Sequence, residues 1–81
     1  MSTDKGHRPL YIIANDIRKD WERPYFGAVP YIEAMRQVSG ISDTYGMDDA
    51  DMIVRYFLGN ANTWRGPVAR AIKTELKGML T

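Results

Sequence analysis

The chain has 81 residues, of which 44% are hydrophobic and 26% are charged, and its formal net charge is +1. These proportions are typical of a single globular domain and exclude a chain that is disordered as a whole. The near-neutral charge gives no overall attraction to nucleic acid or to a membrane surface. Cysteine is absent, which excludes a disulfide framework, a thiolate metal site and a cysteine nucleophile.

The polar residues 1–8 show no periodicity and predict a flexible N-terminal tail, so that 9–81 form a single helical domain. The next segment, PLYIIANDIRKDW, predicts a first helix because its apolar residues recur at helical spacing and Pro9 suits the first position. The apolar stripe consists of Leu10, Ile13, Ala14, Ile17 and Trp21.

A turn in ERPYFGA separates this helix from a second one, because an arginine precedes a proline there and a glycine permits a sharp turn. The second helix is predicted from Pro30 to about Val38, with Ile32 and Met35 facing the same way. Gly40 is then expected to cap its carboxyl end.

The segment SDTYGMDDADMIVRYFLGN predicts a third helix with several start signals. Asp48 is the expected N-cap, and Asp49 and Asp51 place negative charge on the first turn, where the helix dipole favours it. Met47 and Met52 have the spacing of a hydrophobic staple. The helix is apolar around much of its circumference, which predicts the most buried position in the fold. Its apolar residues after the first turn are Ile53, Val54, Tyr56, Phe57 and Leu58.

The last helix is predicted to begin at Gly66 and Pro67, as cap and first residue, with Thr63 as the cap of an earlier start at Trp64 as the alternative. It is expected to bury a stripe of Ala69, Ile72 and Leu76. No segment shows convincing strand alternation. The sequence therefore predicts an all-α fold, a small four-helix single domain that is orthogonal or bundle-like. The predicted core is Ile13, Ile17, Trp21, Ile32, Met35, Ile53, Phe57, Ile72 and Leu76.

Residues for catalysis or metal binding are scarce. His7 is the only histidine and lies in the predicted tail, without a positioned partner. The four aspartates between residues 43 and 51 do not match a calcium loop, because the sixth and twelfth positions counted from Asp43 are not glycine and glutamate. Helix capping explains three of them better. We therefore expect no enzymatic activity, no cofactor and no metal.

Aromatic residues divide into two groups. Helical spacing points one group toward the core: Trp21, Tyr56 and Phe57. The others, Tyr25, Phe26 and Trp64, lie in predicted turns, where a core role and a contact role remain equally open. Together with Arg65 they form the candidate partner-binding set, because aromatic residues and arginine are enriched at interface hot spots.

The basic residues near the end of the chain give an alternative site on a nucleic-acid backbone. Its candidate residues are Arg65, Arg70, Lys73 and Lys77. The connection from Gly59 to Gly66 is longer than in a helix-turn-helix, and the first turn of the last helix has no side chain that reads base edges. The helix dipole also favours late cations, and Glu75 is expected to pair with them, so a solvated face is the favoured interpretation.

Charge is distributed unevenly along the second half of the chain. Residues 41–54 carry a net charge of −4 and residues 55–81 carry +4. Because the two blocks adjoin in the sequence, we expect the acidic one to cancel much of the basic charge at the surface.

The first nine residues, MSTDKGHRP, lack the apolar segment of a signal peptide. No apolar run reaches the roughly 18 to 20 residues that span a bilayer. The sequence therefore predicts a cytoplasmic protein without a membrane partner.

Four phrases carry a resemblance to a known group: YIIANDIRKDW, PYIEAM, DMIVRYFLGNANTWRG and ARAIKTELKGML. Together they resemble a group of short bacterial proteins of unknown function, some encoded by phages or prophages. The resemblance implies an accessory protein of a mobile element. We expect a small non-catalytic protein that acts through protein–protein contacts. The alternative is a nucleic-acid-binding helical domain; the partner and the oligomeric state remain open.

Overall fold

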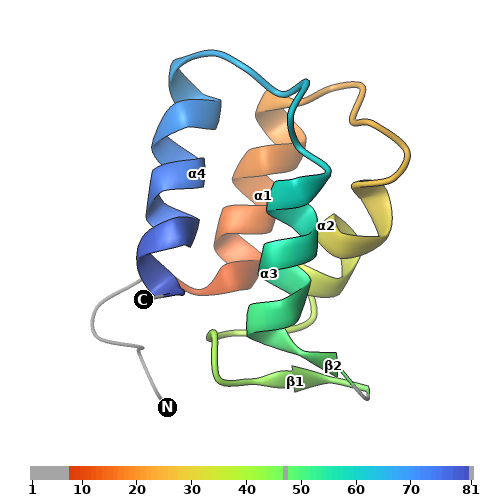
Figure 1. Ribbon diagram of the computed structural model, residues 1–81, viewed down its shortest axis with the longest axis vertical. Coiled ribbons are helices and arrows are strands. Elements are labelled where there is room, and N and C mark those ends of the chain that lie inside the picture. Colours follow the sequence, from red (N-terminus) through yellow and green to blue (C-terminus); the bar gives the residue numbers. More distant parts are fainter. Residues whose placement is uncertain (1–7, 47, 81) are drawn as a thin grey trace.

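A computed structural model describes residues 8–46 and 48–80, and four helices account for most of them. The helices are α1 (Leu10–Asp20), α2 (Val29–Met35), α3 (Ala50–Gly59) and α4 (Pro67–Met79). Helices that follow one another in the chain run in opposite directions (Figure 1). In this arrangement α1 contacts both α2 and α4, and α3 packs against α2.

A small hairpin precedes α3 and corrects the prediction of a purely all-α fold. Strands β1 (Thr44–Tyr45) and β2 (Asp48–Asp49) pair antiparallel, with Thr44 opposite Asp49. Gly46, whose φ is 64°, lies in the turn between the strands. The fold is therefore mostly helical with a two-stranded hairpin at one end of the bundle (Figure 1).

The start of α3 also differs from the prediction. Asp48 is not the N-cap, because it pairs in β2 and the helix begins two residues later. Asp49 holds the cap position, with extended backbone but no side-chain cap hydrogen bond. The predicted first-turn acid Asp51 is in place. Met47, the expected staple partner of Met52, lies outside the described residues.

Asp43 ties the connection between α2 and α3 together. Its Oδ2 accepts hydrogen bonds from the backbone N–H groups of Ser39 (2.8 Å) and Gly40 (3.1 Å), and these bonds lower the pKa of the carboxyl group. Its backbone oxygen accepts from the N–H of Ala50 at 2.8 Å, and the oxygen of Ser39 accepts from Leu10 N–H at 2.7 Å. The connection is thereby fastened to the first residues of both α1 and α3.

The second helix is shorter than its sequence pattern predicts. It ends at Met35, and residues 36–38 continue as turns, so Gly40 is not its carboxyl cap. Val38 is nevertheless 4% exposed, because the turns keep it against the core. The start of α4 is as predicted: Gly66 has a φ of 112°, which favours glycine, and Pro67 is the first helical residue.

The predicted core is confirmed, since all nine of its residues are buried. Tyr56 is an exception among the inward-pointing aromatics, because it is 47% exposed. On α3 the buried positions are Ala50, Ile53, Val54 and Phe57, and Tyr56 shares the neighbouring outer face with Met52. Its ring contacts Tyr31 of α2, with centroids 5.5 Å apart, at the edge of the α2–α3 packing.

Candidate functional site

The tryptophan of the α3–α4 loop lies in the core and not at the surface. Trp64 is 2% exposed and stacks on Trp21, with ring centroids 5.6 Å apart, and Phe57 meets it edge-on. The indole N–H donates a 2.8 Å hydrogen bond to Asp20 Oδ2, which satisfies the polar atom of the ring. The assignment of Trp64 to a partner-binding surface is therefore wrong, because aromatic rings from α3 and the end of α1 enclose it.

Lys73, a candidate for phosphate contact, also has a role inside the fold. Its Nζ donates a 2.7 Å hydrogen bond to the backbone oxygen of Trp64 and lies 5.9 Å from the centroid of that ring. Burial lowers the pKa of Lys73, and the positive charges of Lys77 and Arg65 lower it further. This side chain fastens the α3–α4 loop to α4.

The turn between α1 and α2 exposes its aromatic residues. We call residues 22–28 the aromatic loop; it lies at the upper right of Figure 1. Phe26 is 79% exposed and Tyr25 is 45% exposed, and their ring centroids are 4.9 Å apart. The turn is closed by hydrogen bonds from Ala28 N–H to Tyr25 O (2.8 Å) and from Val29 N–H to Phe26 O (3.3 Å). Tyr25 and Phe26 thus form one surface feature.

A shallow hollow of about 290 Å³ lies beside the aromatic loop. We call it the polar hollow; its lining is Tyr25, Gly59, Asn60, Asn62 and Thr63. Amides and a hydroxyl therefore stand next to an aromatic ring. No binding role for these polar residues was expected, although the GNANT segment concentrates amides between two helices.

The Tyr25 ring and the side chain of Asn60 both approach the backbone closely at Gly27. A Cβ on Gly27 would lie 2.6 Å from Tyr25 Cε2 and 2.9 Å from Asn60 Oδ1, distances that side-chain atoms do not tolerate. The amide of Asn60 is held in turn, since its Nδ2 donates to Tyr56 O at 2.9 Å. Glycine at this position lets the Tyr25 ring and the end of α3 approach the same backbone.

The basic residues gather on another surface, whose residues follow those of the polar hollow in the chain. We call Arg65, Arg70, Lys73 and Lys77 the basic face. The first three line a hollow of about 260 Å³ together with Trp64, Gly66 and Ala69. Lys77 lies one helical turn beyond Lys73, and Arg65, Arg70 and Lys77 are exposed. The predicted set of Tyr25, Phe26, Trp64 and Arg65 is therefore divided between two surfaces and the core.

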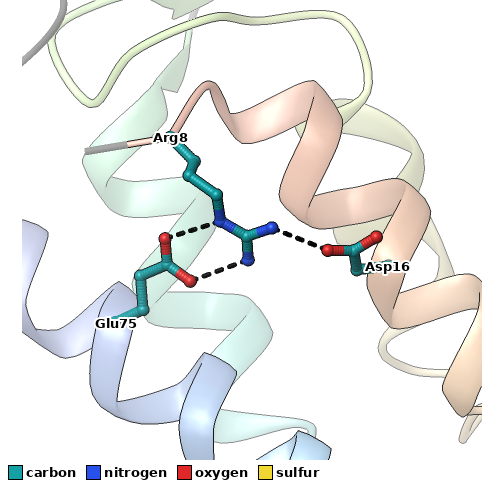
Figure 2. A network of polar contacts seen from close by, with 3 residues as sticks. All are labelled: Arg8, Asp16 and Glu75. Atoms are coloured by element: carbon teal, nitrogen blue, oxygen red, sulfur yellow. Dashed lines mark hydrogen bonds and ion pairs between the residues drawn. The ribbon is translucent and has the colours of Figure 1, made fainter. Parts of the chain in front are cut away.

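The pairing of Glu75 differs from the prediction. Its carboxylate does not pair with the neighbouring cations of α4, because Arg8 binds it through two hydrogen bonds, Nε to Oε2 at 2.9 Å and Nη2 to Oε1 at 2.8 Å (Figure 2). The third guanidinium nitrogen of Arg8 donates to Asp16 Oδ2 at 2.7 Å. The two carboxylates raise the pKa of Arg8. Arg8, expected in the tail, thus joins α1 to α4.

Other kinds of site find no support in the described part of the chain. Within residues 8–46 and 48–80, no three histidine, cysteine, aspartate or glutamate side chains are grouped as a metal site would require. None of the helices there has the length and apolar character to cross a membrane. His7 lies outside these residues.

The two surfaces are thus the aromatic loop with its polar hollow, and the basic face. No protein-family model, curated protein or solved structure matches this chain.

Proposed function

We propose that this protein is a small non-catalytic binding module that contacts another protein through its aromatic loop. The observation that carries the proposal is the 79% exposure of Phe26. Burying a phenylalanine side chain contributes about 1.5–3 kcal/mol, a gain that the isolated fold forgoes at this position. A partner surface that covers Phe26 recovers it.

The surroundings of Phe26 support the same function. Tyr25 lies beside it, and the polar hollow adds the side chains of Asn60, Asn62 and Thr63. An apolar centre with hydrogen-bonding groups at its rim is the usual anatomy of a protein interface. The two hydrogen bonds that close the turn hold the loop in place, which reduces the entropy lost on binding.

The biological setting of the proposal is an accessory role in a mobile element. The resemblance of four phrases of the chain to short bacterial proteins, some of them encoded by phages or prophages, supports it. The binding partner is then a protein of the host cell or of the element itself.

The test is affinity capture with two single-residue variants. Wild-type protein, Phe26→Ala and Tyr11→Ala are immobilised and exposed to the same lysate. Tyr11 is a matched control, because it is an aromatic residue of α1 with 42% exposure. We expect a partner whose binding weakens about 30-fold with Phe26→Ala, as for the loss of an interface hot spot, and is unchanged with Tyr11→Ala.

Two results would contradict the proposal. One is equal recovery of every captured protein by the wild type and by Phe26→Ala. The other is a catalysed reaction that survives purification and disappears when a single aspartate or arginine is changed.

A further inference from the structure

The positive charge of the basic face is not neutralised by the described acidic residues. The ion pairs among residues 8–46 and 48–80 join Arg8, Arg18 and Arg36 to carboxylates, and none includes a member of the basic face. Glu75, the one acidic residue of α4, is bound by Arg8 (Figure 2). The sequence favoured a solvated face because Glu75 was expected to pair with the cations of its own helix. That pairing is missing, so Glu75 does not neutralise the basic face.

The acidic segment does not compensate for the charge of Arg65 either. The hairpin that carries Asp48 and Asp49 lies at the lower end of the bundle, and the loop that carries Arg65 lies at the upper end (Figure 1). The charges that perturb the pKa of Lys73 are those of Lys77 and Arg65, both positive. The cations thus repel one another.

The shape of the basic face fits an extended polyanion better than a single small anion. Arg70, Lys73 and Lys77 follow one another along α4 over seven residues, about 10 Å at 1.5 Å per residue. That length is comparable to the rise of about three phosphates along one strand of duplex DNA. Arg65 extends the row beyond the start of the helix. The hollow of about 260 Å³ on the basic face is lined by both Arg65 and Lys73.

We propose that the basic face binds the phosphodiester backbone of duplex DNA without reading its sequence. The binding is independent of the aromatic loop, because the two surfaces share no residue. It is unspecific because the residues exposed on the first turn of α4, Pro67 and Val68, offer no side-chain donor or acceptor to base edges.

Three substitutions test the surface without disturbing the fold. Arg65, Arg70 and Lys77 are changed together to Gln, and Lys73 is kept because it holds the Trp64 carbonyl. The control changes Lys19, Arg23 and Arg55 to Gln, which are exposed cations outside the basic face. Both variants remove the same charge. Circular dichroism and thermal melting verify that each remains folded.

The readout is the fluorescence anisotropy of a labelled duplex of about 30 base pairs, titrated between about 50 and 150 mM salt. Three or four phosphate contacts give a log–log salt slope of about −3, so the wild-type affinity should fall about 30-fold over this range. The basic-face variant should give a slope of about −1 or shallower. The control variant should keep the wild-type slope.

Three results would overturn the inference. The first is no binding of the wild type at about 50 mM salt. The second is an equal loss of slope in the control variant, since net charge alone then explains it. The third is displacement of the duplex by inorganic phosphate at matched ionic strength, which indicates a discrete anion site and not a backbone-binding surface.

Discussion

Two turns of this protein have similar composition and opposite environments. The α1–α2 turn contains RPYFG and the α3–α4 turn contains TWRGP, each an aromatic residue beside an arginine, a proline and a glycine. Phe26 of the first is 79% exposed, whereas Trp64 of the second is 2% exposed. The difference shows that an aromatic residue in a turn is buried when neighbouring helices provide space for its ring and a hydrogen-bond partner for its polar atom.

The second turn has these neighbours for its aromatic ring. The end of α1 supplies both a stacking ring, Trp21, and a hydrogen-bond acceptor, Asp20, and α3 supplies the edge of Phe57. The first turn has no such enclosure, and Phe26 contacts the ring of Tyr25, which is itself half-exposed.

Replacing the buried aromatic should have the largest effect. Trp64→Ala removes a stacked indole from the core and leaves a cavity, and we expect it to lower the free energy of unfolding by about 3–5 kcal/mol. The total free energy of unfolding of a domain of this size is little larger than that loss, so the variant should be largely unfolded at about 37 °C. Urea denaturation followed by circular dichroism measures the change. A loss below about 1 kcal/mol would show that Trp64 does not belong to the core.

Removing the acceptor of the indole N–H should have an intermediate effect. Asp20→Ala leaves the N–H of Trp64 without its partner, and we expect a loss of about 1 kcal/mol. Asp20→Asn keeps an acceptor oxygen and should lose less. Glu22→Ala is the control, because that carboxylate is exposed one residue beyond Trp21. Equal melting curves for Asp20→Ala and Glu22→Ala would refute a stabilising role of the bond.

Replacing the exposed aromatic should have the smallest effect on stability. Phe26→Ala removes a ring that the folded chain leaves in water, so the free energy of unfolding should change by less than about 0.5 kcal/mol. The same urea titration measures it. A loss comparable to that of Trp64→Ala would mean that Phe26 is buried in solution, and the contrast between the two turns would disappear.

The functional candidates were only partly accessible from the sequence. Exposed aromatics at Tyr25 and Phe26 could be proposed from their turn, but the polar hollow could not, since it joins that turn to residues 59–63. The unneutralised basic face was likewise hidden, because helical spacing placed Glu75 near the cations of its own helix. The residue that binds the Glu75 carboxylate is Arg8, which is 67 residues away in the chain.

What the sequence by itself determined is the set of helices and their inward faces. The 3.6-residue period of Leu10, Ile13 and Ile17 in α1 and of Ala69, Ile72 and Leu76 in α4 is a local property, and all six residues are buried. The start of α4 is local as well, since a glycine with positive φ followed by proline fixes it.

Only the tertiary structure decided what happens between these helices. The hairpin of β1 and β2 replaces a simple cap at Asp48, and the hydrogen bond from Ala50 N–H to Asp43 O closes the chain just outside the paired strands. Trp64 is enclosed because Trp21 at the end of α1 and Phe57 of α3 pack against its ring, whereas Phe26 stays exposed because its ring contact is with the half-exposed Tyr25. Such contacts join residues far apart in the chain, so their existence depends on how the helices pack and not on any local pattern.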